Sequence, residues 1–165
     1  ARAQEARQGL RYDPDIGRDA RLSCSSSGHA WLSTLGDDAA LALVAQQGVG
    51  QPADYGPQAP ASLADVMAVV QATRERGYSL TTETYTAGLN AMAAPVRFAG
   101  QPAMGVISIA GPTVRFTLER MQALGEELMN IAAQLAAASG ASPFFAKSSQ
   151  ALSATTAGRK PIYAP

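Results

Sequence analysis

Apolar side chains recur at helical spacing in two long segments, and each segment has helix-start and helix-stop signals. In SLADVMAVVQATRERG, Ser62 and Asp65 form a capping pattern and Gly77 follows the last turn. The apolar stripe of this segment consists of Leu63, Val66, Val69, Val70 and Thr73. The second segment runs from its N-cap Thr117 to Gly140. Its stripe consists of Met121, Leu124, Leu128, Ile131 and Leu135.

Two shorter helices are predicted before the first long one. In SSGHAWLSTL the apolar side chains share one helical face; they are Ala30, Trp31, Leu32 and Leu35. DDAALALVAQQG follows, with Asp37 as the expected N-cap and Gly48 just after the end. Residues 48–61 then hold three prolines and three glycines, which predicts a loop rather than a linker between domains.

Three short apolar segments between the long helices are predicted to be strands: YSLTT, GLNAMAAPVRF and AMGVISIAG. A turn at residues 99–102 joins the last two, which favours a hairpin. The run Val106–Ile109 is typical of a sheet interior, with Ser108 as its one polar position. Strands that follow one another favour an α+β fold, with a mainly antiparallel sheet and helices packed on it. No G-x-G-x-x-G motif follows a strand, so a dinucleotide-binding fold has no support.

The chain divides into three parts by regularity. Residues 1–22 are polar, with a weak edge-strand signal at Leu10–Tyr12, and we interpret them as the N-terminal remnant of the domain. Residues 23–140 hold the periodic segments and form the expected domain core. Residues 141–165 form a C-terminal extension with little periodicity. Its apolar side chains suggest that parts of it dock on another surface; they are Phe144, Phe145, Ile162 and Tyr163.

Composition narrows the class of protein. The 165 residues fit one domain, which we interpret as part of a longer protein. Thirteen basic residues balance thirteen acidic ones, so charge gives this segment no reason to bind nucleic acid. A single cysteine excludes an internal disulfide and fits a reducing cytoplasm. No apolar run is long enough to span a bilayer, and no secretory signal pattern opens the chain.

The stretch SCSSSGHAW contains the only cysteine, histidine and tryptophan of the chain. One hypothesis is a small hydrolase that uses Cys24 or Ser26 as nucleophile and His29 as base. That mechanism needs a third group to orient the base, and the sequence offers no obvious one nearby. One Cys and one His also make a poor metal-ligand set, so we expect no metal site and no cofactor.

A loop of small residues that enters a helix has a different use. Backbone N–H groups at a helix start are unpaired and favour an anion, and serine hydroxyls add further donors. Ser26, Ser27 and Gly28 are therefore candidate ligand contacts, and Gly28 is expected to leave the backbone open to the ligand. Serines at helix starts also serve as caps, and both interpretations stand at this point.

Four motifs occur in order along residues 9–140: SSSGHAWLSTL, ATRERGYSLTTETYTAGLNAMAAPV, GVISIAGP and FTLERMQALGEELMNIAAQL. Together they resemble the C-terminal effector-binding domain of IclR-family bacterial transcription regulators. The resemblance implies a GAF-like α+β domain without enzymatic activity that binds a small organic acid or aromatic compound.

The resemblance also implies further effector-binding positions and several departures from the family pattern. Thr81, Ala91, Ser108 and Ala110 occupy positions that face the ligand in acid-sensing members. Three of these differ from the usual residues, with Thr81 at an acidic position, Ala91 at a cysteine and Ala110 at a serine. His29 stands where the family has a lysine. We therefore expect a less polar sheet side of the site than in acid-sensing relatives.

The implied partners follow from the same resemblance. They are a small-molecule effector and other copies of the chain, as a homodimer or tetramer in the cytoplasm, with no membrane partner. DNA would be bound only through an N-terminal winged helix-turn-helix domain that is absent from this sequence. A ligand-free dimerisation module, with the family cavity closed by side chains, is the remaining alternative.

Overall fold

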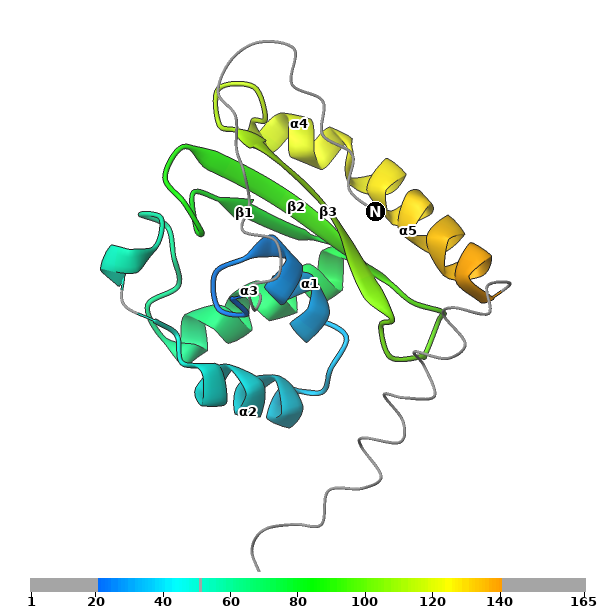
Figure 1. Cartoon of the computed structure of the whole chain (residues 1–165), viewed down its shortest axis with the longest axis horizontal. Coiled ribbons are helices and arrows are strands. Elements are labelled where there is room, and N and C mark those ends of the chain that lie inside the picture. Colours follow the sequence, from blue (N-terminus) through cyan, green and yellow to red (C-terminus); the bar gives the residue numbers. More distant parts are fainter. Residues whose placement is uncertain (1–20, 51, 141–165) are drawn as a thin grey trace, which may run out of the picture.

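An antiparallel sheet of three strands separates two groups of helices in the computed structural model, which describes residues 21–50 and 52–140 (Figure 1). The predicted strand at Leu10–Tyr12 and the predicted docking of the C-terminal extension lie outside the described residues. The elements are α1 (Ser26–Leu32), α2 (Asp37–Gln47), a 3-10 turn η1 (Pro52–Asp54), α3 (Leu63–Arg76), β1 (Ser79–Thr82), β2 (Leu89–Val96), β3 (Gly105–Pro112), α4 (Leu118–Ala123) and α5 (Gly125–Gly140).

The sheet has the order β1-β2-β3, with β2 in the centre. Its register fixes which residues share a face. Thr81 pairs with Ala91, and Ala91 pairs with Ala110, so these three side chains form one row across the sheet. The neighbouring row on the same face is made by Ser79, Ala93 and Ser108. This face consists of small side chains.

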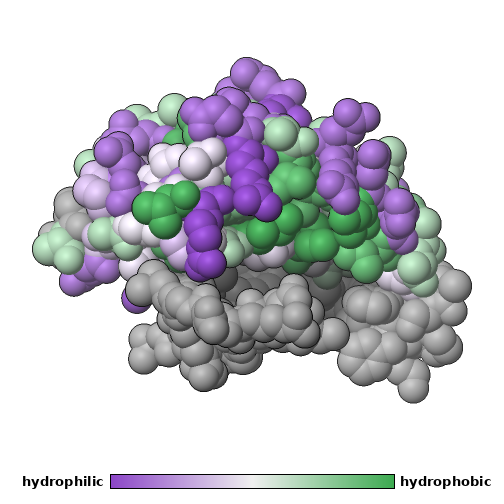
Figure 2. Space-filling model, turned by 90° about the horizontal axis from the view of Figure 1, so that it is seen from above, coloured by the Kyte–Doolittle hydropathy of each residue, from purple (hydrophilic) through white to green (hydrophobic). Residues whose placement is uncertain are grey.

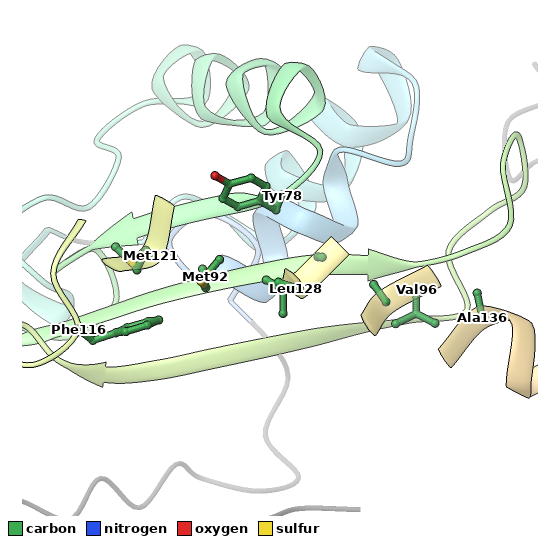
Figure 3. Close-up of a cluster of buried hydrophobic side chains, with 9 residues drawn as sticks. Tyr78, Met92, Val96, Phe116, Met121, Leu128 and Ala136 are labelled. Carbon is green, nitrogen blue, oxygen red and sulfur yellow. The ribbon is translucent and has the colours of Figure 1, made fainter. Parts of the chain in front are cut away.

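The opposite face carries the larger apolar side chains and packs on α4 and α5. Met92 and Val96 of β2 lie in one buried cluster with Met121 of α4 and Leu128 of α5 (Figure 3). Met121 and Leu128 are at most 1% exposed. Burying a side chain of this size contributes about 1.5–3 kcal/mol. The sheet is thus anchored from this side, which leaves the small-residue face to the N-terminal helices.

The second core cluster joins α1, α2 and α3, with Leu32, Val44 and Val66 fully buried. Arg74, in the last turn of α3, holds the α1–α2 connection in place. Its guanidinium donates to the Leu35 carbonyl at 2.8 Å and contacts the Asp37 carboxylate at 2.6 Å. These contacts fix α1 relative to α3 and therefore relative to the sheet.

The structure confirms most predicted elements and corrects three details. The cap of α2 is Gly36, which makes no side-chain bond, so the expectation that Asp37 caps this helix is wrong. The predicted C-terminal helix is divided at Leu124 into α4 and α5. A Cβ added to Gly125 would overlap the Tyr78 ring, so the close approach of that ring explains a glycine at this point. The third correction concerns β3 and is described below.

Candidate functional site

Helix α1 lies against the small-residue face of the sheet. The hydroxyl of Ser79 donates to the carbonyl of Ser26 at 2.8 Å, and both residues are buried. Ala93, in the same row as Ser79, is also fully buried. Because this hydrogen bond joins β1 to α1, the small-residue face of the sheet is the face that lies against α1. The structure therefore brings the predicted serine-rich loop and the predicted strand positions to opposite sides of one interface.

The serine that caps α1 is Ser25. Its hydroxyl accepts the Gly28 N–H at 3.0 Å and donates to the Arg21 carbonyl at 2.6 Å. The capping interpretation is thus confirmed for Ser25, whereas Ser26 and Ser27 occupy the first two helical positions. The side chain of Ser26 is buried, and that of Ser27 is half-buried.

Gly28 is required for packing within the chain. A Cβ at this position would lie 2.6 Å from the Leu22 Cα and 2.8 Å from the Arg21 carbonyl oxygen. Both are backbone atoms that cannot rotate away. The expectation that Gly28 leaves its backbone open to a ligand is wrong, because the preceding chain already occupies that side and Ser25 already binds its N–H group.

Two further bonds hold the serine-rich loop between neighbouring segments. The Thr84 hydroxyl, just after β1, donates to the Cys24 carbonyl at 2.6 Å. The Ser23 hydroxyl donates to the Val49 carbonyl at 2.8 Å. The chain just before α1 is therefore bonded both to the segment that follows β1 and to the segment that follows α2. Such fixed backbone is suited to presenting hydroxyls at defined positions.

Burial on the small-residue face falls from β1 to β3. Thr81 is buried, and its hydroxyl donates to the Ala91 carbonyl at 3.0 Å. Ala91 is half-buried, whereas Ser108 and Ala110 are exposed. The prediction that the run Val106–Ile109 is interior is wrong, since β3 is the last strand of the described sheet and its middle is open.

His29 and Cys24 do not form a catalytic pair. The Nε2 of His29 donates to the Ser23 carbonyl at 2.9 Å, and its Nδ1 is buried without a partner among the described residues. Burial lowers the pKa of His29, opposed by the bond to Ser23, so the ring is neutral. Burial also raises the pKa of the Cys24 thiol to about 11, which keeps it protonated and unreactive at neutral pH.

The neutral, buried state of His29 predicts that the protein loses stability in mild acid. Below the ordinary histidine value of about 6.5 the unfolded chain binds a proton that the folded chain excludes, so stability falls as pH falls. Between pH 7.5 and 5.5 we expect a loss of up to about 1.4 kcal/mol in the free energy of unfolding. Chemical denaturation at several pH values measures it. In His29→Gln this slope should largely disappear, and an unchanged slope would contradict the assignment, since His29 is the only histidine.

Other kinds of site find no support in the part of the chain that the structure describes. Across residues 21–50 and 52–140, no three His, Cys, Asp or Glu side chains gather as a metal-binding group. Within the same ranges, no helix has the length and apolar composition needed to cross a membrane. Glu83, in the β1–β2 turn, accepts the Gly88 N–H at 2.7 Å and so stabilises that turn.

Comparison with known proteins decides the family. The family model described as bacterial transcriptional regulator IclR C-terminal matches residues 3–137. The chain belongs to this family. It is therefore a regulatory domain of the IclR family, and the hydrolase hypothesis falls, because the matched relatives are transcription regulators.

Individual relatives agree with this assignment. The HTH-type transcriptional repressor AllR of Escherichia coli K12 is 26% identical over 136 residues, which cover 82% of this chain and 49% of AllR. The chain thus spans about half the length of the curated relatives it matches. The crystal structure of the Agobacterium tumefaciens repressor BlcR is 26% identical with a TM-score of 0.65, covering 74% of this chain and 49% of BlcR.

A third comparison supports the α+β fold alone. The inducer-binding domain of the Acinetobacter transcription factor PobR is 23% identical with a TM-score of 0.66. The match covers 78% of this chain and 74% of that one. PobR was solved, as a double mutant, in complex with 3-hydroxybenzoic acid.

The residues singled out in the sequence therefore gather in the structure, although three contributors were not foreseen. Thr81, Ala91 and Ala110 form one row, Ser108 lies in the next, and Ser26 is bonded to the sheet beside them. Ser25, Ser79 and Thr84 were missed as the groups that hold the loop. A helix-start serine run signals a cap, but it does not show which serine caps or which strand hydroxyls reach the helix.

Proposed function

We propose that this domain binds a small organic acid or aromatic compound between α1 and the small-residue face of the sheet. Binding would modulate DNA affinity through a winged helix-turn-helix domain that is not in this chain. The observation that carries the proposal is the register. Thr81, Ala91 and Ala110 form one row on the face toward α1, and Ser108 adds a hydroxyl in the next row.

The seven proposed effector-binding residues fall into two groups by burial. Ser27, Ala91, Ser108 and Ala110 are half-buried or exposed, so a ligand can reach them directly. Ser26, Gly28 and Thr81 are buried and already engaged within the chain, which suits them to support the site from behind. The hydroxyls of Ser27 and Ser108 are the groups we assign to a carboxylate or another polar end of the effector.

The chemistry of the face favours an effector with a small polar end and an apolar body. Alanine at positions 91 and 110 offers apolar surface without charge. Thr81 stands where acid-sensing relatives carry an acidic residue, and its proton is used by the Ala91 carbonyl, so toward a ligand it acts only as an acceptor. A hydroxylated aromatic acid meets both demands. The PobR complex with 3-hydroxybenzoic acid supports this class.

Regulation follows if the effector prefers one of two arrangements of the regulator, since only differential affinity can shift an equilibrium. Helix α1 is the element best placed to sense occupancy, because it contacts the sheet and is tied to α3 through the Arg74 bonds near its C-terminal end. We further propose that residues 23–140 form the effector-binding unit, that the regulator is a cytoplasmic homodimer or tetramer, and that it has no membrane partner.

Ligand binding by the purified domain tests the proposal. A panel of monocarboxylic, dicarboxylic and hydroxybenzoic acids and neutral aromatics is screened by thermal shift, and calorimetry gives affinities. Combining Ser26→Ala, Ser27→Ala and Ser108→Val should abolish the binding of any hit. Ile109→Thr, on the opposite face of the same strand, is the matched control. Wild-type affinity in the triple variant would remove this site, and a panel without hits would favour the ligand-free dimerisation module.

A further inference from the structure

The outer side of α5 carries an apolar row that no described residue covers. Ile131 and Leu135 are 38% and 44% exposed, and they lie one turn apart on the helix. Glu127 continues the row by one more turn toward the N-terminus and is exposed as well. Figure 2, seen from the side of α4 and α5, shows apolar side chains gathered among polar ones.

This row is separate from the face of α5 that serves the core. Leu128, Ala132 and Ala136 point to the sheet and are buried, so they account for the packing of the helix on β2. Ile131 and Leu135 sit next to them around the helix but remain half open. Together the two side chains form an apolar strip on the outer side of α5 that a neighbouring segment can cover.

The segment that directly follows α5 has the matching chemistry. Phe144 and Phe145 come four and five residues after Gly140, and Lys147 follows two residues later. Residues 141–165 contain no acidic side chain. The segment thus presents aromatic side chains followed by the cation of Lys147. Helix α5, followed from Leu135 toward its N-terminus, presents two apolar side chains and then the carboxylate of Glu127.

The spacings also agree when the segment runs back along the helix. At 1.5 Å per helical residue, Leu135, Ile131 and Glu127 lie about 8, 14 and 20 Å from Gly140. At 3.3 Å per extended residue, Phe144, Phe145 and Lys147 reach about 13, 17 and 23 Å. Phe145 can therefore reach Ile131 and Lys147 can reach Glu127, in order and with little slack.

We propose that residues 141–147 dock antiparallel on the outer face of α5 of the same chain. In this arrangement Phe145 and Lys147 share one side of the extended segment, so Phe145 covers the pair Ile131 and Leu135 and the Lys147 ammonium meets the Glu127 carboxylate. The occupant of the face is this segment, and a second copy of the chain is the competing outcome. The contact is independent of the effector site, which lies across the sheet.

Carbodiimide cross-linking of the full chain tests the docking, because it joins amines to carboxylates that touch. The lysines are Lys147 and Lys160, both in the extension, so few amides can form. We expect a Lys147–Glu127 amide in tryptic digests. It should be absent in Lys147→Arg and lost in the double variant Phe144→Ser with Phe145→Ser. The matched double variant Ile162→Ser with Tyr163→Ser should retain it.

Mixing protein of two nitrogen isotope compositions separates the two occupants. An amide looped within a single tryptic peptide of residues 121–159, at a yield independent of protein concentration, supports docking within one chain. Mixed-isotope peptides, or a yield that rises with concentration, would show a second copy on this face and overturn the proposal. So would a Lys147–Glu127 yield that does not change in the Phe144 and Phe145 double variant.

Discussion

Replacing Ala110 with phenylalanine is expected to weaken effector binding at least about tenfold, which corresponds to about 1.4 kcal/mol, without unfolding the domain. Ala110 is exposed on β3, so a larger side chain meets no packed neighbour there. It ends the row that starts at Thr81 and passes through Ala91, and an aromatic ring at this end would cover the row. Calorimetry with the tightest ligand from the acid and aromatic panel measures the loss.

Ile109→Phe is the control for this prediction. Ile109 is adjacent in sequence and also exposed, at 39%, but its side chain points to the opposite face of the sheet. The control should bind with wild-type affinity, and both variants should unfold near the wild-type temperature. Equal affinities of the Ala110 variant and the wild type would mean that the effector does not use this face.

Replacing Gly28 with valine is expected to destabilise the domain by about 1–3 kcal/mol or more, as overpacking in a rigid setting does. The new side chain would begin 2.6 Å from the Leu22 Cα, so α1 or the segment before it must shift. That shift would disturb the Ser25 cap and the bond from Ser79 to Ser26. Urea denaturation measures the loss of stability.

Gly105→Ala provides the matched comparison for Gly28. A Cβ at Gly105 would have open space around it, and its backbone is not in the left-handed region, so its stability should stay within about 0.5 kcal/mol of the wild type. Wild-type stability of the Gly28 variant would show that the close approach of Leu22 is not a constraint on the fold.

The sequence predicts the elements of this fold well because their signals are local. The α3 segment shows this best, since its cap Ser62 and its terminal Gly77 both sit where the pattern puts them. The β2–β3 hairpin was likewise predicted from its turn. What local signals miss is set by neighbours distant in the chain. The predicted helix is divided at Leu124, next to the point where the Tyr78 ring packs against Gly125. The apolar pattern of the helix gives no sign of this distant contact.

The candidate site was predictable only in part for the same reason. The resemblance to the IclR family indicated which strand positions share the site, and the register places them on one face. The sequence does not reveal the role of Gly28. A glycine that leaves the backbone accessible to a ligand cannot be distinguished in sequence from a glycine that allows Leu22 to approach the helix closely. The exposure of Ser108 does not follow from the sequence either, since an apolar strand pattern does not show that β3 is the last strand among the described residues.

The most direct test of the account is a nitrogen–proton correlation spectrum recorded while the tightest ligand from the panel is titrated into the domain. The proposal predicts that the largest amide shift changes occur at Ser27, Ala91, Ser108 and Ala110, on both sides of the interface between α1 and the sheet. Changes centred on Ile131 and Leu135 of α5, with those four amides unmoved, would contradict it.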